Sequence, residues 1–307
     1  MNMIIHDDGH TNVVASDGLV SDADLRAKVN NFGFQYGRFD FIITNPPFGS
    51  TVKQVEKAYM SQYRLAAREV DWLNPKSSAS ERPNQDTEIL FLEQCHKYLA
   101  PKGILAMVIP DSILTNSSLQ YVRDSLEELF RILAVVSMPQ TAFTATGAGV
   151  KSSVLFLKKY SDAQTQEIQA LKSDLKYTIA SEEKLVETLH NIELEKKETL
   201  KFLHGFADLD NSKLSALQLK ATPEYKAWAK EVSETATAKV EALRYRLSEI
   251  YEAKRRAALA DYPIFMAIAE DIGYDATGKK TPNKPNDFEI ITLELRRFIE
   301  QVEKGEI

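Results

Sequence analysis

The segment FDFIITNPPFGS (residues 39–50) ends an apolar run with an amide, two prolines and an aromatic ring. Pro46 forces the backbone of Asn45 toward an extended conformation, and both prolines have a fixed φ and no N–H. The resulting rigid edge presents two hydrogen-bond acceptors, the side-chain oxygen of Asn45 and the carbonyl of Pro46. Two fixed acceptors suit a group with two N–H bonds, such as an exocyclic amine. Phe48 adds a flat face for stacking a base, a contact worth about 1–3 kcal/mol.

Adenine N6 is such an amine, and it is a poor nucleophile because its lone pair is delocalised into the ring. Two acceptors that hold its two hydrogens favour a more pyramidal nitrogen, whose lone pair can attack the methyl group of a sulfonium cofactor in line. The proton can leave afterwards, so no general base is needed before the attack. A base inside duplex DNA cannot reach such a pocket and has to be flipped out.

The alternative is that Asn-Pro-Pro is simply a turn. From average composition, Asn-Pro-Pro-aromatic is expected by chance on the order of once in several hundred chains of this length. Its position favours the functional interpretation, because ligands of α/β sheets bind just beyond the carboxyl ends of strands, and Asn45 follows the apolar strand-like run.

Strand and helix patterns alternate through the first half of the chain. The expected strands are TNVVASDGL (11–19), FDFIITN (39–45), GILAMVIP (103–110), RILAVVSMP (131–139) and VKSSVLFLKK (150–159). The second of these is of the kind buried on both faces. Helices are expected over 86–99 and after Asn116 or Ser117, where apolar residues recur at helical spacing. The alternation predicts an α/β domain over residues 1–160, with a parallel or mixed sheet and helices on both faces.

The second half of the chain is helical in pattern. Apolar residues over 185–203 and 243–257 follow heptad-like spacing, with Lys196 in one slot of the first seam. We expect a long helical hairpin over 161–262 and a final amphipathic helix near the C-terminus. Residues 161–307 are therefore predicted to form a second, helical region suited to docking a partner.

Composition limits the function classes. The chain has 307 residues and a net charge of −6, so DNA binding would need a local basic face or a partner subunit. No apolar run approaches the roughly 20 residues that cross a bilayer, and the N-terminus lacks the pattern of a signal peptide, so no membrane association is predicted. The single cysteine, Cys95, excludes an intramolecular disulfide and suits a reducing cytoplasm, where we expect the protein to act.

These motifs resemble the N6-adenine DNA methyltransferases, specifically the modification subunit of type I restriction-modification systems. The resemblance covers nearly the whole chain and rests on MNMIIHDDGHTNVVASDGL, FDFIITNPPFGS, TEILFLEQCHKYLAPKGILAMVIPDSILTN, RILAVVSMPQTAF with GVKSSVLFLKK, and YPIFMAIAEDIGYDATGKK. It implies a partial class I S-adenosylmethionine-dependent (Rossmann-like) fold and methyl transfer from S-adenosylmethionine to a flipped adenine in double-stranded DNA. The implied partners are a specificity subunit, docked on the helical region and reading the DNA sequence, and a restriction subunit.

The resemblance also assigns roles to residues. The catalytic motif would be Asn45, Pro46, Pro47 and Phe48, and the cofactor would contact Asp17, Gly18 and Leu19, with Asp17 at its adenine. An Asp-Gly pair is also a common turn, so Asp17 has that alternative. Phe143 would line the target-base pocket or simply belong to the core.

Two further groups have functional and structural interpretations. Lys151, at the start of a strand, could contact substrate phosphate or be a solvated strand-end residue. The densest basic group, Arg244, Arg246, Lys254, Arg255 and Arg256, could contact DNA phosphates or form a solvated helix face. No metal is predicted, because the five histidines show no metal-ligand spacing.

The chain departs from the family at the cofactor loop. Members carry a glycine-rich loop after their first strand and an acidic residue after the second, both upstream of the segment that matches MNMIIHDDGH. Here that segment is the N-terminus, and the Gly-Ala-Gly at 147–149 lies between the last two expected strands, not at a strand-to-helix turn. We therefore expect an incomplete sheet with an unpaired edge and exposed apolar surface, and weak or no methyltransferase activity from this chain alone.

Two other functions remain open. The chain could be a non-catalytic fragment that acts as a DNA- or subunit-binding scaffold through its helical region. It could also methylate an amide nitrogen in a protein, although phenylalanine rather than tyrosine at position 48 argues against this. Cytosine-C5 methylation is disfavoured, because no Pro-Cys pair occurs in the sequence.

Overall fold

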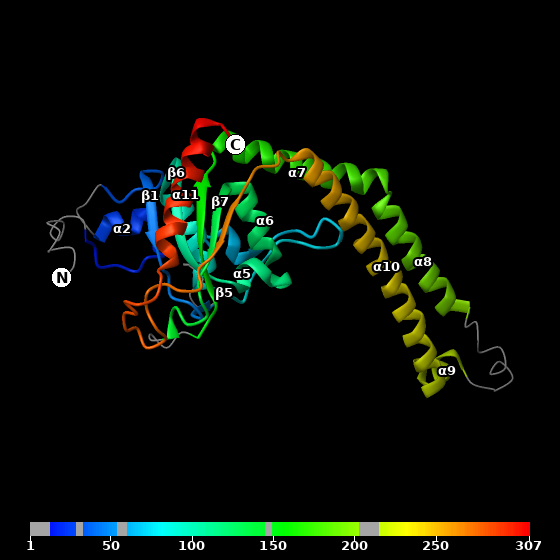
Figure 1. Cartoon of the computed structure of the whole chain (residues 1–307). Helices are drawn as coiled ribbons and strands as arrows, with labels where there is room; N and C mark the ends of the chain where they lie inside the picture. Colours follow the sequence, from blue (N-terminus) through cyan, green and yellow to red (C-terminus); the bar gives the residue numbers. More distant parts are fainter. Residues whose placement is uncertain (1–12, 29–32, 54–59, 145–148, 203–214) are drawn as a thin grey trace. The chain divides into compact units, whose positions relative to one another are not determined.

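The computed structural model describes residues 13–28, 33–53, 60–144, 149–202 and 215–307. The chain forms two compact units (Figure 1). Unit 1 comprises residues 1–69, 79–169 and 262–307, and unit 2 comprises residues 70–78 and 170–261.

A five-stranded mixed sheet forms the centre of unit 1. Its strands lie in the order β1 (Phe39–Thr44), β6 (Leu99–Pro110), β8 (Ser152–Lys159), β7 (Phe130–Ser137) and β9 (Phe265–Ile268). β1 is parallel to β6 and β9 is parallel to β7, whereas β8 is antiparallel to both of its neighbours. The start of β8 therefore lies on the same side of the sheet as the C-terminal ends of β1, β6 and β7.

One face of the sheet is covered by α4 (Thr87–Tyr98), α5 (Ser112–Thr115) and α6 (Gln120–Leu129). Strand residues that alternate toward these helices pack with apolar residues of α4 and α6 to form the main core. It includes Ile89, Leu92, Leu105, Met107, Ile109, Leu126, Phe130, Leu155 and Leu157. Cys95 belongs to this core, and burial raises the pKa of its thiol to about 12. The predictions for β1, β6, β7, β8, α4 and α6 are confirmed to within a few residues, apart from β6, which begins earlier at Leu99. The sequence did not predict α5 or β9.

The opposite face of the sheet carries α11 (Asp287–Lys304) (Figure 1). Lys158 alternates with the core residue Leu157, and its ammonium lies 3.3 Å from a carboxylate oxygen of Glu303 in α11. The rings of Phe265 in β9 and Phe298 in α11 also meet, with centroids 5.8 Å apart. Helices on both faces confirm the expected α/β architecture.

The last segment of the chain belongs to the sheet unit. The sequence grouped residues 161–307 into one helical region, but residues 262–307 cluster with the sheet. The physical reason is that β9 pairs with β7, from Ala134 opposite Phe265 to Ser137 opposite Ile268. Local periodicity cannot show a pairing between segments so far apart in the chain.

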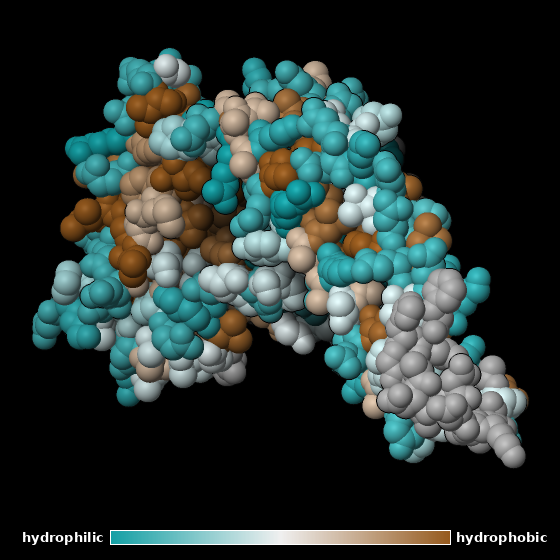
Figure 2. All heavy atoms as spheres, turned by 90° about the vertical axis from the view of Figure 1, so that its right-hand side faces the viewer, coloured by the Kyte–Doolittle hydropathy of each residue, from teal (hydrophilic) through white to brown (hydrophobic). Residues whose placement is uncertain are grey.

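β1 forms an edge of the sheet and exposes apolar side chains. Phe41 is 67% exposed and Ile43 is 85% exposed, whereas Ile42 between them packs against the main core. The prediction that residues 39–45 are buried on both faces is therefore wrong. Among the described residues, no strand pairs with the outer side of β1, so the expected open edge with apolar surface is present. Figure 2, drawn from the right-hand side of Figure 1, shows further brown apolar patches within a teal surface.

One other local prediction differs from the structure. Residues 13–19 were expected in a strand but are irregular, and residues 11 and 12 lie outside the described ranges. A strand needs a hydrogen-bonded neighbour, whereas here the Leu19 carbonyl accepts from the side chains of Gln62 and Tyr63. In the described part of 53–70, the short 3-10 helix η2 (Arg64–Ala66) precedes the short strand β3 (Ala67–Arg68).

Unit 2 is helical. It contains α8 (Leu185–Phe202), α9 (Ala216–Ala221), α10 (Pro223–Ala258) and the C-terminal part of α7 (Asp162–Glu182). The two predicted seams meet, because Leu185 and Leu189 of α8 pack with Leu243, Leu247 and Tyr251 of α10. The expected hairpin is confirmed for the described residues. None of the helices in those ranges has the length and hydropathy needed to span a membrane.

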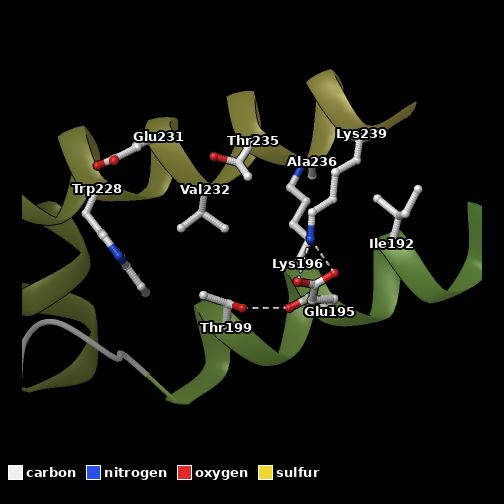
Figure 3. Close-up of a pocket in the computed structure, with 10 residues that line it drawn as sticks. All are labelled: Ile192, Glu195, Lys196, Thr199, Trp228, Glu231, Val232, Thr235, Ala236 and Lys239. Carbon is white, nitrogen blue, oxygen red and sulfur yellow. Dashed lines mark hydrogen bonds and ion pairs between the residues drawn. The ribbon is translucent and has the colours of Figure 1, made fainter. Parts of the chain in front are cut away.

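A cavity of about 310 Å³ lies between α8 and α10 (Figure 3). Its lining consists of Ile192, Glu195, Lys196, Thr199, Trp228, Glu231, Val232, Thr235, Ala236 and Lys239. The Lys239 ammonium bonds both oxygens of Glu195, at 2.6 and 2.7 Å. Most of the lining is polar or small, so we attribute the cavity to incomplete packing of the seam.

Candidate active site

The carboxyl end of β1 leads into the Asn45–Phe48 motif. Pro46 is buried, Phe48 is half-buried, and Asn45 and Pro47 are exposed. Gly49 follows with a φ of +72°, in the left-handed region that favours glycine, and turns the chain away from the motif. Within the described ranges, no protein group hydrogen-bonds the Asn45 side chain or the Pro46 carbonyl, so both acceptors are available to a ligand.

Phe143 lies beside the Asn45–Phe48 motif. Its ring centroid is 6.4 Å from that of Phe48, and the two ring planes are 89° apart, which is an edge-to-face arrangement. Phe143 belongs to the loop that follows β7, so two strand ends meet at this edge of the sheet. The structure thus brings together two of the residues to which the sequence assigned the base pocket.

Lys151 is held by the end of β7. Its ammonium donates to Ser137 Oγ at 2.9 Å and also to the Met138 carbonyl. These bonds fasten the strand that leads to the loop of Phe143. The intramolecular partners show a structural role for Lys151, and its contact with substrate stays a prediction.

Asp111 lies just beyond the end of β6, on the same side of the sheet as the end of β1, and sequence reasoning did not single it out. It directly follows β6, and its Oδ1 accepts a hydrogen bond from Ser153 Oγ at 2.7 Å. Its N–H donates to the Lys151 carbonyl at 3.0 Å. The signal was present, because Pro110-Asp111-Ser112 follows a predicted strand just as Asn45 does.

Asp17 and Gly18 lie at a separate cavity of unit 1, of about 260 Å³. The cavity is lined by Val14, Ser16, Asp17, Gly18, Leu25, Phe34, Phe39, Ile42 and Tyr98. Asp17 also forms a turn, because its Oδ1 accepts from the Leu19 N–H at 3.0 Å. The turn and ligand interpretations of Asp17 are therefore compatible.

Leu19 faces away from this cavity. Its side chain is 4% exposed and packs in a second apolar cluster with Val52, Met60, Tyr63 and Leu90. It is not among the residues that line the cavity. If Leu19 contributes to ligand binding, it does so by fixing the turn that carries Asp17 and Gly18.

The cavity residues fit the nucleoside part of a cofactor. Aromatic rings suit a flat base, and the Asp17 carboxylate can accept hydrogen bonds from an amine or hydroxyl. The volume of about 260 Å³ is slightly below the roughly 300–1,000 Å³ of typical pockets for whole small ligands. The cavity is thus suited to part of such a ligand.

The basic group of α10 is largely ion-paired. Within unit 2, Arg244 pairs with Asp71, Arg246 with Glu183, Lys254 with Glu182 and Arg255 with Glu252. Exposed pairs of this kind contribute little stability, but they neutralise the charges that phosphates would need. The geometry favours the solvated helix-face interpretation of this group.

Comparison with known proteins gives the family. A family model described as N-6 DNA methylase matches residues 1–240. The chain belongs to the N-6 DNA methylase family. The methylase subunit of the type I restriction enzyme EcoEI from Escherichia coli is 30% identical over 121 residues, which are 39% of this chain and 21% of that protein. This chain therefore aligns with about a fifth of the length of that relative.

Similar solved structures include two subunits of type I enzymes. The EcoKI M protein is 20% identical with a TM-score of 0.34, over 53% of this chain and 29% of that one. A modification subunit of a putative type I restriction enzyme from Vibrio vulnificus YJ016 is 18% identical with a TM-score of 0.36, over 52% of this chain and 29% of that one.

Proposed function

We propose that this chain carries the catalytic motif of a DNA adenine-N6 methyltransferase of the type I restriction-modification class. The observation that carries the proposal is the Asn45–Phe48 motif at the carboxyl end of β1, with two acceptors that no described group occupies. The edge-to-face contact of Phe143 with Phe48 and membership of the N-6 DNA methylase family support it.

The chain's own residues would hold the target base. The Asn45 side-chain oxygen and the Pro46 carbonyl accept the two hydrogens of adenine N6, which directs the nitrogen lone pair outward. Phe48 stacks on the base, which has been flipped out of the duplex, and Phe143 supports the Phe48 ring. The same two acceptors stabilise the positive charge that develops on N6, and the extra proton leaves to solvent afterwards.

The proposed cofactor is S-adenosylmethionine, which supplies a methyl group on a positively charged sulfur. Asp17, Gly18 and the aromatic residues of the 260 Å³ cavity would hold its adenosine part. Among the described residues, no glycine-rich turn joins the end of a strand to the start of a helix. We therefore expect weak cofactor binding and low activity from this chain by itself.

The proposed partners are double-stranded DNA, a specificity subunit and a restriction subunit. Unit 2 supports this proposal, because its long helices α8 and α10 provide a surface for a partner protein. Neutralised charges on α10 suggest that sequence reading is left to another subunit.

Calorimetric titration with S-adenosylmethionine, followed by transfer of a labelled methyl group to duplex DNA, tests the proposal. The assay is run with the chain alone and with its partner subunits added. We expect Asn45→Ala to abolish formation of N6-methyladenine while cofactor binding is retained, since Asn45 contacts the base only. If the full assembly binds DNA but leaves adenine unmethylated, the non-catalytic scaffold is the correct function.

A further inference from the structure

One face of α4 contacts both halves of the candidate site. Thr87, Phe91 and Gln94 follow i, i+4, i+7 spacing and therefore share a face of the helix. Seven residues of helix place Thr87 and Gln94 about 10 Å apart along the axis. Both are buried polar residues, 9% and 2% exposed, so their hydrogen-bond partners show what they hold in place.

Thr87 fastens the catalytic motif. Its hydroxyl has a single hydrogen to donate, and the acceptors within reach are the Pro47 carbonyl at 3.0 Å, the Ser50 carbonyl at 3.1 Å and Glu88 Oε2 at 3.4 Å. Its backbone N–H also donates to the Ser50 carbonyl, at 3.0 Å. The Glu88 carboxylate in turn receives a hydrogen bond from the backbone of Gly49. The first turn of α4 therefore fixes the chain from Pro47 to Ser50, which includes the second half of the Asn45–Phe48 motif.

Gln94 fastens the turn that carries Asp17. Its Nε2 donates to the Gly18 carbonyl at 3.2 Å and to the Val20 carbonyl at 2.7 Å. Its Oε1 accepts from the Tyr36 hydroxyl at 3.2 Å. The side-chain amide thus uses both its donor and its acceptor, and two of its bonds hold the turn of residues 17–20.

Phe91 lies between these two residues and sets how closely the turn approaches the helix. A Cβ added at Gly18 would lie 2.9 and 3.0 Å from two ring carbons of Phe91, closer than ordinary contact. Glycine at position 18 therefore permits the close approach. The same helix face thus holds the catalytic motif at one end and the cofactor turn at the other.

We propose that Thr87 and Gln94 are positioning residues, and that α4 fixes the spacing between the base-binding acceptors and the cofactor cavity. The chemical meaning of this spacing rests on the proposed methyltransferase function. The contacts that produce it do not depend on that function. In-line transfer between two bound groups is sensitive to misplacement, so a rigid helix between the two sites would serve the reaction.

Amide hydrogen exchange of the full chain tests the two contacts separately. Thr87→Val removes the hydroxyl at nearly constant volume, Thr87→Ser retains it, and Gln94→Leu removes the amide. Ile89→Val is the matched control, because Ile89 is a buried residue of α4 that points to the main core. The reporters are the amides of Gly49 at the motif and of Leu19 and Val20 at the turn, which are hydrogen-bonded.

We expect Thr87→Val to speed exchange at Gly49 about 2- to 10-fold, the effect of losing one hydrogen bond, and to leave Leu19 and Val20 unchanged. Gln94→Leu should do the reverse, and Thr87→Ser should match the wild type. Calorimetry should show weaker S-adenosylmethionine binding for Gln94→Leu than for Thr87→Val.

The inference is overturned if either variant loosens both segments equally, if neither exceeds Ile89→Val, or if Thr87→Ser behaves like Thr87→Val. A wild-type chain that shows no cofactor binding and no methylation, even with its partner subunits, would instead contradict the proposed function. The exchange pattern would still decide whether α4 positions the two segments.

Discussion

The rings of Phe48 and Phe143 meet edge to face, with centroids 6.4 Å apart and planes 89° apart. Phe48 follows β1 and Phe143 follows β7, with β6 and β8 between these strands in the sheet. The contact therefore links the segments that follow two strands which are not neighbours in the sheet. It joins the Asn45–Phe48 motif to a loop that lies in a distant part of the sequence.

Truncation of Phe143 should weaken base binding without removing the acceptors. An aromatic pair of this geometry contributes about 0.5–1.5 kcal/mol, so Phe143→Ala should lower the affinity for an adenine oligonucleotide about 2- to 10-fold. Both tryptophans, Trp72 and Trp228, lie in unit 2, so Phe48→Trp places a fluorescent reporter at the motif.

Titration of the oligonucleotide against Phe48→Trp, with and without Phe143→Ala, measures this effect through tryptophan quenching. Phe143→Leu is the control, since it keeps apolar bulk without an aromatic edge. Equal affinity in all three proteins would show that Phe143 plays no part in base binding.

Local pattern was sufficient for the central strands and helices. β1, β6, β7 and β8 are apolar runs bounded by polar or proline-containing segments, and α4 carries Ile89, Leu92 and Cys95 at helical spacing, so the apolar pattern alone is enough to locate them. The position of Asn45 at a strand end followed from the same pattern. Those predictions need no knowledge of which strand pairs with which.

Features that depend on contacts between distant segments could not be predicted from the sequence. The exposure of Phe41 and Ile43 depends on which segments pack against β1. An apolar run has the same sequence pattern whether or not another element packs on it. The anchoring roles of Thr87 and Gln94 depend on carbonyls of segments elsewhere in the chain. In the sequence, these two residues are polar positions inside a predicted helix, and their burial is seen in the structure.

The open edge at β1 should cause self-association. Phe41 and Ile43 present apolar surface beside a strand side that pairs with no other strand among the described residues, a combination that promotes edge-to-edge pairing. We expect the double variant Phe41→Thr, Ile43→Thr to shift the chain toward monomer, since threonine keeps strand propensity but lowers apolarity. Sedimentation velocity across a concentration series measures this shift.

The control for the edge variants is Met266→Thr in β9, the strand at the other edge of the sheet. This residue is 76% exposed, so its substitution removes exposed apolar surface at the opposite edge of the sheet. A wild-type chain that is monomeric at every concentration would rule out the prediction, and an equal effect of Met266→Thr would assign the association to general apolar exposure.

Filling the cavity between α8 and α10 should stabilise unit 2. Thr199 lines the cavity, and its hydroxyl donates only to the Glu195 carbonyl of its own helix, at 2.8 Å. Thr199→Leu should raise the free energy of unfolding by about 1 kcal/mol through added apolar burial and better helix propensity. Chemical denaturation followed by tryptophan fluorescence measures this, because Trp228 also lines the cavity.

Thr237→Leu is the control that separates the effect of cavity packing from the effect of helix propensity. Thr237 is exposed on α10, and its hydroxyl donates to the Ser233 carbonyl in the same way, at 2.9 Å. The substitution changes helix propensity equally but buries no apolar surface. Equal stabilisation by the two variants would mean that the cavity contributes nothing.

His96 should make the fold acid-sensitive. Burial, together with the charges of Lys159 and Lys97, lowers the pKa of its imidazole to about 3, and its Nε2 has no hydrogen-bond partner among the described residues. The unfolded chain takes up this proton near the ordinary pKa of about 6.5. The stability contributed by neutral His96 is therefore present above about pH 6.5 and is lost as the pH falls toward 3, by up to about 1.4 kcal/mol per pH unit.

His96→Phe keeps the edge-to-face contact with Phe130, whose ring centroid lies 5.1 Å from the imidazole, and removes the titrating group. Urea unfolding at pH 7, 6, 5 and 4 should show the wild type losing stability faster than the variant below pH 6.5. Carboxylates that titrate in the same range affect both proteins equally, so only the difference between the two curves reports on His96. Parallel curves would show that His96 is protonated as readily in the folded chain as in the unfolded one, and that its burial does not exclude the charge.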